Sequence, residues 1–255
     1  CRSDRHQPYP PPARYLRGDT DPGRVGDTFD RLAEVRDGTF DPTPAEVEHI
    51  RALYLAEVRY VDDQIGRLME HLKALGLYED TLIVLTSDHG EELWDHGGFE
   101  HGHTLYEELL RVPLVIKTPG TSPRRENSPA SLEDVAPHIL HACGIAAGPP
   151  EARDVHHASA TLYGPALESV SFGPYKLIHD RDGGGHQLYD LDADPGEADD
   201  VSAERPEEVF HGRGLIADHA ARSAGARDRL EAAPPTQLDL DEGTRAQLRE
   251  LGYIE

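Results

Sequence analysis

The chain has 255 residues, of which 37% are hydrophobic, and its 48 acidic against 25 basic residues give a formal net charge of −23. This length fits one large domain or one and a half small ones, and the composition does not place the chain among disordered proteins. So negative a charge argues against nucleic acid or an anionic membrane surface as a partner. A site that binds an anion would need a locally positive potential, which a metal ion and histidines can supply.

The sequence contains no transmembrane segment, because no apolar run approaches the required length. Two cysteines, Cys1 and Cys143, allow at most one disulfide and form no disulfide framework. Cysteine usage therefore does not decide between a periplasmic, secreted or cytoplasmic location.

Residues 1–42 are rich in Pro, Arg and Asp and show little periodicity, so we expect loop structure there. The proline-rich stretch from His6 to Tyr15 cannot be helical, because prolines remove hydrogen-bond donors and clash with a helical backbone. Without further information, His6 is interpreted as a loop histidine.

A long helix is predicted to start at Thr43 and to stop at Gly76. Thr43 suits the N-cap, Pro44 suits the first helical position, and Glu46 completes a capping box. Apolar residues then recur at helical spacing up to Leu75.

The run from Leu82 to Leu85 is apolar and β-branched, which predicts a strand buried on both faces of a parallel sheet. Ser87, Asp88 and Gly90 end this pattern. Ligands of open α/β sheets bind at the carboxyl ends of strands. Asp88 and His89 at this place are therefore interpreted as two ligands of one divalent metal ion.

The loop that follows is dense in groups that ligate metals or transfer protons: Glu91, Glu92, Asp95, His96, Glu100, His101 and His103. Of these, His96 and Glu100 are interpreted as loop-shaping. A short helix is expected over 104–110, a strand over 112–117 and a helix over 131–143, with Pro137 predicting a kink or a late start.

From about residue 151 the pattern changes to short, partly alternating runs between Gly, Pro and Asp. These runs, at 158–163, 167–172, 175–179 and 187–190, predict a small antiparallel sheet. Residues 206–255 are acidic, rich in Arg and prone to form helix.

Four blocks of this sequence resemble, in order and at close to the right spacing, the sulfatase family of the alkaline phosphatase superfamily. They are Ser87-Asp-His-Gly-Glu91, then His96-Gly97 with His101-Gly-His-Thr-Leu-Tyr-Glu-Glu108, then Arg111-Val-Pro-Leu-Val-Ile116, then Pro119-Gly120. The Asp-His-Gly string alone would be unspecific, whereas the ordered set is specific. The run from Leu188 to Glu197 resembles the C-terminal subdomain of the same family.

The resemblance implies an α/β fold: a partial alkaline-phosphatase-like mixed or parallel sheet with flanking helices, plus a small C-terminal antiparallel sheet subdomain. Residues 1–150 would be the C-terminal part of the sulfatase α/β core. Residues 151–205 would form the small antiparallel β subdomain, and residues 206–255 a helical acidic tail.

The resemblance also assigns roles to residues. Asp88 and His89 would supply part of the shell of one divalent metal ion; Ca²⁺ is expected from the family, and the imidazole of His89 makes Mn²⁺ or Zn²⁺ alternatives. His101 would contact the sulfate and assist the leaving group as a general acid, with His103 as second choice. His6 would contact the anionic group of the ester at the active site.

Sulfatases use a formylglycine made from the cysteine of a Cys-x-Pro-x-Arg motif, and an Asp-Asp pair that completes the metal shell. Neither the motif nor this pair, which lies N-terminally in the family, occurs in this chain: Cys1-Arg-Ser-Asp-Arg5 has Ser3 in the place of proline and lies too close to His6. The resemblance therefore covers a C-terminal half, and we expect the formylglycine upstream. The chain alone is predicted to be inactive, with a missing N-terminal half as its partner.

The function that the resemblance implies is hydrolysis of a small-molecule or saccharide sulfate ester. Two alternatives stay open. One is a phosphatase or phosphonate monoester hydrolase of the same superfamily, which Asp88 and His89 would also fit as a metal pair. The other is a non-catalytic metal-binding module.

Overall fold

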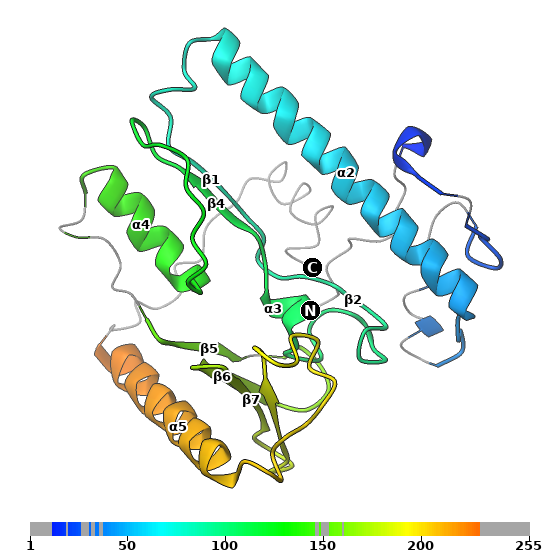
Figure 1. Ribbon diagram of the computed structural model, residues 1–255, viewed down its shortest axis with the longest axis vertical. Coiled ribbons are helices and arrows are strands. Elements are labelled where there is room, and N and C mark those ends of the chain that lie inside the picture. Colours follow the sequence, from blue (N-terminus) through cyan, green and yellow to red (C-terminus); the bar gives the residue numbers. More distant parts are fainter. Residues whose placement is uncertain are drawn as a thin grey trace, which may run out of the picture. The chain divides into compact units, whose positions relative to one another are not determined.

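The computed structural model describes residues 12–18, 20–26, 31, 34–35, 38–145, 148, 153–159 and 161–229. These residues belong to two compact units, one reaching to Ala74 and the other starting at Leu75 (Figure 1). His6, which was predicted to contact the anionic group of an ester, lies outside the described residues, as does the tail after Arg229.

The first unit is built on one long helix, α2 (Pro44–Ala74). The capping box predicted at its start is confirmed, because the Thr43 amide donates to Glu46 Oε2 at 2.8 Å and the Glu46 amide donates to Thr43 Oγ1 at 3.3 Å. Arg24 forms an ion pair with the same carboxylate at 2.7 Å. Two backbone donors and a guanidinium therefore fix the start of the helix.

A short 3-10 helix, η1 (Ala13–Tyr15), contacts α2 through its last residue. The Tyr15 hydroxyl donates to Asp63 Oδ2 at 2.6 Å, and its ring meets Tyr60 edge to face with centroids 5.5 Å apart. Asp63 thus has a partner within its own unit.

The apolar stripe of α2 is buried only in its first half, where Ile50, Leu53 and Ala56 are fully buried. Later apolar side chains of the helix are exposed: Val58, Val61 and Leu68. The sequence pattern therefore predicts the helix and its apolar face, but the described residues of this unit cover only the first part of that face.

In the second unit, the strand predicted after residue 81 is β1 (Ile83–Thr86), and the strand predicted before residue 118 is β4 (Leu114–Lys117). The two strands pair antiparallel as a two-stranded sheet, with Ile83 opposite Lys117. The predicted parallel sheet is therefore wrong for the described residues, among which no parallel pairing occurs.

The reason for this error is that an apolar run does not say how many strands flank it or which way they run. Leu85 is 37% exposed and Val115 is 56% exposed, so neither β1 nor β4 is covered on both faces by the described residues. A fully buried strand and a half-exposed hairpin strand can carry the same apolar residues.

Between β1 and β4 lie three short elements: β2 (Glu92–Leu93), β3 (Phe99–Glu100) and α3 (Glu107–Leu110). Strands β2 and β3 pair antiparallel, and the rings of Trp94 and Phe99 stack at 4.5 Å beside them. This part of the chain carries most of the predicted site residues.

After β4, a 3-10 turn η2 (Leu132–Asp134) leads into helix α4 (Val135–Ala142). The Ser131 hydroxyl accepts from the Glu133 amide at 3.3 Å. The predicted effect of Pro137 is confirmed as a late start, because this proline lies in the first turn of α4, where its missing N–H is not needed.

The small antiparallel sheet predicted in the C-terminal part is confirmed, with the strand order β5-β6-β7-β8. Its strands are β5 (Val155–Ser159), β6 (Leu167–Phe172), β7 (Tyr175–Asp180) and β8 (His186–Asp190). Asp180 closes the glycine-rich turn after β7 by accepting from the amides of Asp182 and Gly183.

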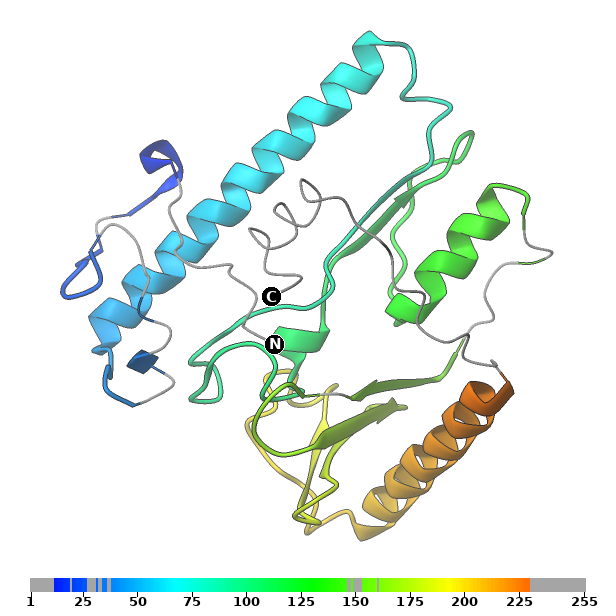
Figure 2. The ribbon, with the colours of Figure 1, turned by 180° about the vertical axis from the view of Figure 1, so that it is seen from behind.

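Helix α5 (Pro206–Arg229) covers one face of this sheet (Figures 1 and 2). Gly212 allows the close approach, because a Cβ there would lie 2.9 Å from the Leu177 side chain. The core between helix and sheet is formed by Val170, Phe172, Leu177, Leu188, Val209 and Ile216.

The opposite face of the sheet packs against the segment that contains α3. Leu105 from that segment forms a buried cluster with Ile178 and Tyr189 of the sheet. The small sheet therefore has two apolar faces, one for α5 and one for the segment with the predicted site residues.

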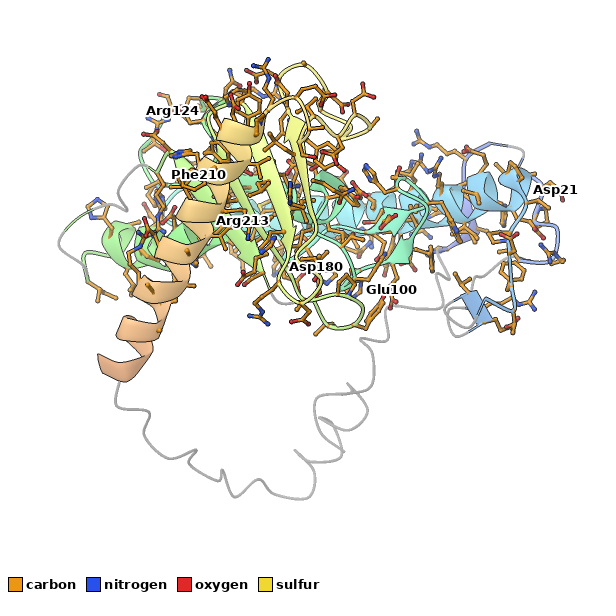
Figure 3. The ribbon with its side chains drawn as sticks, turned by 90° about the horizontal axis from the view of Figure 1, so that it is seen from below. Asp21, Glu100, Arg124, Asp180, Phe210 and Arg213 are labelled. Carbon is orange, nitrogen blue, oxygen red and sulfur yellow. The ribbon has the colours of Figure 1, made fainter. Side chains whose placement is uncertain are left out.

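On α5, Phe210 and Arg213 are exposed, and Phe210 reaches 83% exposure (Figure 3). No helix in the described part of the chain combines the length and the apolar character that crossing a membrane requires.

Candidate active site

Asp88 and His89 follow β1 in a turn that depends on the glycine after them. The Gly90 amide donates to the Leu109 carbonyl at 2.8 Å and ties the turn to α3. A Cβ at position 90 would clash with the backbone carbonyl of Glu108. The glycine of the Asp-His-Gly string is thus explained by a close approach of two backbone segments.

The carboxylate of Asp88 and the imidazole of His89 lie near each other, with 3.9 Å between Asp88 Oδ1 and His89 Nε2. The Asp88 side chain is 86% exposed and that of His89 is 31% exposed. His89 Nδ1 lies 2.8 Å from the Gly90 carbonyl, which can only accept. This contact favours the tautomer with the proton on Nδ1, which leaves the lone pair of Nε2 for a metal ion.

The ring of His101 stacks on the ring of His89, with centroids 3.9 Å apart and an interplanar angle of 29°. His101 is buried, at 7% exposure, and its Nδ1 lies 3.0 Å from Glu91 Oε1. A carboxylate on one ring nitrogen fixes the orientation of an imidazole ring. The predicted general acid and one predicted metal ligand therefore lie side by side.

His103 has a different environment. Its Nε2 lies 3.0 Å from Oε2 of the fully buried Glu92, and its Nδ1 lies 3.5 Å from the hydroxyl of Tyr163. The two rings also stack, with centroids 5.6 Å apart. Each ring nitrogen of His103 thus lies within 3.5 Å of a protein oxygen.

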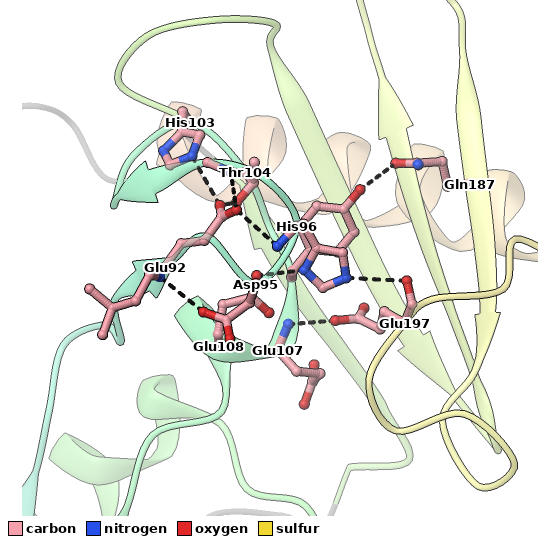
Figure 4. A network of polar contacts seen from close by, with 12 residues as sticks. Glu92, Asp95, His96, His103, Thr104, Glu107, Glu108, Gln187 and Glu197 are labelled. Atoms are coloured by element: carbon pink, nitrogen blue, oxygen red, sulfur yellow. Dashed lines mark hydrogen bonds and ion pairs between the residues drawn. The ribbon is translucent and has the colours of Figure 1, made fainter. Parts of the chain in front are cut away.

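Glu92 is the centre of a network that shapes this loop (Figure 4). Its Oε1 accepts from the amides of Gly98 at 2.6 Å and His96 at 3.2 Å, and its Oε2 accepts from the Thr104 hydroxyl at 3.3 Å. Burial raises the pKa of Glu92, but the hydrogen bonds from His103 and Gly98 outweigh it and hold the pKa below its usual value. The carboxylate is therefore kept ionised inside the loop.

His96 connects the same loop to the segment after β8. Its Nδ1 lies 2.7 Å from Glu108 Oε1, its Nε2 lies 3.2 Å from the Glu197 carbonyl, and its ring stacks on Tyr106 at 3.7 Å. Burial lowers the pKa of His96, but the hydrogen bond and charge of Glu108 outweigh it, so the pKa is raised. These contacts support the predicted loop-shaping role of His96.

Four residues hold the loop in a way that the sequence did not predict: Glu92, which was counted only among ligating or proton-transferring groups, and Tyr163, Lys176 and Glu197, which were given no role. Three of them come from segments far along the chain, so local patterns could not connect them to the loop. One signal was present, because Lys176 lies between apolar residues of β7, two positions before Ile178 and therefore on the same face of the sheet.

Asp88 and His89 fit two positions of a metal shell, because an anionic oxygen and an imidazole nitrogen 3.9 Å apart can face one ion. Within the part of the chain that the structure describes, no three or more His, Cys, Asp or Glu side chains are grouped to hold a metal ion. A complete shell would need donors in addition to these two residues.

A strand that ends in an Asp-His pair beside a buried histidine, on a mixed α/β fold, is typical of the alkaline phosphatase superfamily. Within it, the model of the sulfatase family matches residues 4–145, which is more than half of the chain. The chain belongs to the sulfatase family.

Two curated relatives illustrate the match. The choline-sulfatase of Rhizobium meliloti is 32% identical over 187 residues, which cover 66% of this chain and 36% of the relative. The N-acetylglucosamine-6-O-sulfatase of Bacteroides thetaiotaomicron is 32% identical over 218 residues, which cover 71% of this chain and 38% of the relative. The chain therefore spans little more than a third of the length of these relatives.

A solved structure, the phosphonate monoester hydrolase of Silicibacter pomeroyi, is similar in fold, with a TM-score of 0.62 and 26% sequence identity. The likeness covers 72% of this chain and 43% of the hydrolase. The shared architecture thus extends beyond the residues that the family model matches.

Proposed function

We propose that this chain is a C-terminal portion of an enzyme that hydrolyses sulfate monoesters with a divalent metal ion. The observation that carries the proposal is the arrangement of Asp88, His89 and His101: a candidate metal pair and a buried histidine that stacks on one of its members. Membership of the sulfatase family supports the same reaction class.

In this proposal Asp88 and His89 hold the metal ion through one carboxylate oxygen and Nε2. When bound, a divalent ion polarises an oxygen of the sulfuryl group as a Lewis acid. Ca²⁺ is the ion most expected from the family, and the imidazole of His89 makes Mn²⁺ or Zn²⁺ alternatives.

His101 is proposed to bind the sulfuryl group and to give a proton to the leaving oxygen, on which negative charge develops during hydrolysis. The contact between Glu91 and Nδ1 of His101 supports this choice, because it fixes the ring orientation. His103 stays the second choice, since Glu92 and Tyr163 already contact its nitrogens. His6 is proposed as a further contact to the anionic group.

The nucleophile of this reaction is proposed to lie outside the chain. The 255 residues contain no Cys-x-Pro-x-Arg motif from which the family makes its formylglycine. We therefore propose that the chain is inactive alone and needs an N-terminal half as its partner. The division into an α/β core part (1–150), a small β subdomain (151–205) and a helical acidic tail (206–255) is proposed with it.

A second candidate is hydrolysis of phosphonate or phosphate monoesters at the same site. The likeness in fold to the phosphonate monoester hydrolase favours it, at 26% identity over 72% of this chain. The carbon skeleton that carries the ester, whether a small molecule or a saccharide, is a separate question that substrate screening addresses.

The test compares the 255-residue chain with the full-length gene product on an aryl sulfate and the matching aryl phosphate and phosphonate. We expect the full-length protein to prefer the sulfate and the chain alone to show no turnover. A preference for the phosphate or phosphonate would replace the first candidate by the second. Robust turnover of the sulfate by the 255-residue chain would contradict the proposal that its nucleophile lies elsewhere.

A further inference from the structure

Glu197 lies in the segment that follows β8 and has a backbone conformation that a glutamate rarely adopts. Its φ is 51°, in the left-handed region that is disfavoured for residues with a Cβ. The residue is also only 2% exposed. A buried carboxylate in a disfavoured conformation persists only where surrounding contacts hold it in place.

Glu197 contacts His96 and Glu107 (Figure 4). Its Oε2 accepts from the Glu107 amide at 2.6 Å, and its carbonyl oxygen lies 3.2 Å from His96 Nε2. His96 precedes His101 in the chain, and Glu107 follows it. Glu197 thus holds the segment 96–107 at both of its ends.

Lys176 anchors Glu197 to the small sheet. This lysine on β7 is fully buried, and its Nζ lies 2.9 Å from Glu197 Oε1 and 2.9 Å from Glu107 Oε1. The ammonium group donates a hydrogen bond to Glu107 and forms an ion pair with Glu197, and such charge interactions are strengthened inside a protein. The sheet therefore fixes the position of the Glu197 side chain.

From His96 the contacts continue toward the site. The His96 amide donates to Glu92 Oε1, and Glu92 Oε2 lies 3.0 Å from His103 Nε2. A continuous set of hydrogen bonds and ion pairs thus joins Lys176 in the sheet to the segment that carries His101.

We propose that Glu197 is a positioning residue, which fixes the segment 96–107 and thereby holds His101 in its place beside His89. The proposal rests on the role proposed above for His101 in ester hydrolysis. It gives the small sheet a part in the reaction, because β7 carries the lysine that holds Glu197.

A purely structural role for Glu197 makes different predictions. A residue that only stabilises the fold changes the folded fraction and leaves the kinetics of each folded molecule unchanged. A positioning residue changes kcat per folded molecule, since small displacements of a reacting group lower the rate by about 10-fold to 100-fold.

The first measurement is amide hydrogen exchange of the 255-residue chain and its Glu197→Ala and Glu197→Gln variants. In Glu197→Ala we expect at least about tenfold faster exchange of the Glu107 amide, while the amides of β7 stay protected. Glu197→Gln keeps an acceptor for that amide and should preserve most of the protection. Glu204→Ala is the control, because Glu204 is exposed in the same segment.

The second measurement is kcat and KM of the same variants in the full-length gene product, per folded molecule. We expect Glu197→Ala to lower kcat by 10-fold to 100-fold, with a smaller change in KM and recovery in Glu197→Gln. Unchanged exchange at Glu107, equal loss of protection in β7, or an unchanged kcat would each overturn the positioning role. In a further outcome, the full-length protein hydrolyses no sulfate ester while Glu197→Ala still loses protection at Glu107 alone. That result would overturn the proposed function and support the role of Glu197 in fixing segment 96–107.

Discussion

The imidazole rings of His89 and His101 lie stacked, 3.9 Å between centroids, although the residues are separated by a loop rich in charged groups. His89 is placed by the turn after β1, and His101 by its contact with Glu91. Because the two rings are in contact, a displacement of one ring changes the position of the other. The two residues therefore form one structural unit, in which the ring of a candidate metal ligand stacks on the ring of a candidate proton donor.

The assignment of His101 over His103 gives a first prediction for the full-length gene product. His101→Gln should lower kcat/KM for an aryl sulfate by about 10²-fold or more, the usual contribution of a general acid. His103→Gln should cost less than about tenfold, because Glu92 and Tyr163 already contact its ring. Steady-state kinetics of the two variants check the order. A larger loss in His103→Gln would reverse the assignment.

The buried lysine gives a second prediction. Lys176→Met leaves Glu107 and Glu197 without their shared cation, so we expect the free energy of unfolding to fall by about 3–5 kcal/mol in urea titrations. Adding Glu197→Gln removes one of the two carboxylates and should recover part of this loss. Lys73→Met is the control, because the Lys73–Glu70 pair is exposed and should contribute less than about 1 kcal/mol. Equal losses in the two lysine variants would refute the buried-cluster argument.

Local patterns predicted much of the secondary structure. The capping box of Thr43 and Glu46 spans three residues, so it is visible in the sequence and is confirmed by two hydrogen bonds. The antiparallel sheet from β5 to β8 was also visible, although its first strand was predicted at 158–163 and lies at Val155–Ser159. Interactions of this kind need no knowledge of distant segments.

The contacts that shape the candidate site were not predictable in the same way. Glu107 and Glu197 are 90 positions apart, and nothing in either local pattern says that one caps the other. The antiparallel pairing of β1 with β4 was missed for a related reason. An apolar run predicts a strand but not whether the adjacent strand runs parallel or antiparallel to it. Sequence motifs suggested a chemistry for the loop, whereas the contacts that hold the loop are tertiary and could not be predicted from those motifs.

His157 provides a prediction about pH. Its ring stacks on His219 with centroids 4.0 Å apart, beside a cavity of about 200 Å³ between β5 and α5. Burial, followed by the charges of His219 and Arg222, lowers the pKa of His157 to about 4. The unfolded chain takes up a proton near pH 6.5 and the folded chain does not, so stability is full above that pH and falls below it.

We therefore expect the free energy of unfolding to fall by about 1–2 kcal/mol between pH 7 and pH 5 through this residue. His157→Gln should flatten that part of the stability profile measured by urea unfolding. His141→Gln, an exposed histidine at the end of α4, is the matched control and should leave the profile unchanged. A profile that His157→Gln does not alter would contradict the assignment.

The capping carboxylate of α2 gives the last prediction. Hydrogen bonds from Arg24 and from the Thr43 amide hold the pKa of Glu46 well below its usual value of 4.5. A carboxyl group with a lowered pKa stabilises the fold above its ordinary pKa, and this contribution is lost as the pH falls below it. Glu46→Ala should therefore lower Tm at pH 7 by about 2–4 °C, and the difference from the parent chain should shrink below about pH 4.5. Glu48→Ala is the control two positions along the same helix, since Glu48 forms an exposed ion pair with Arg51. An equal Tm loss in both variants, or a difference that stays constant as the acid is titrated, would mean that the ionised cap does not hold the start of the helix.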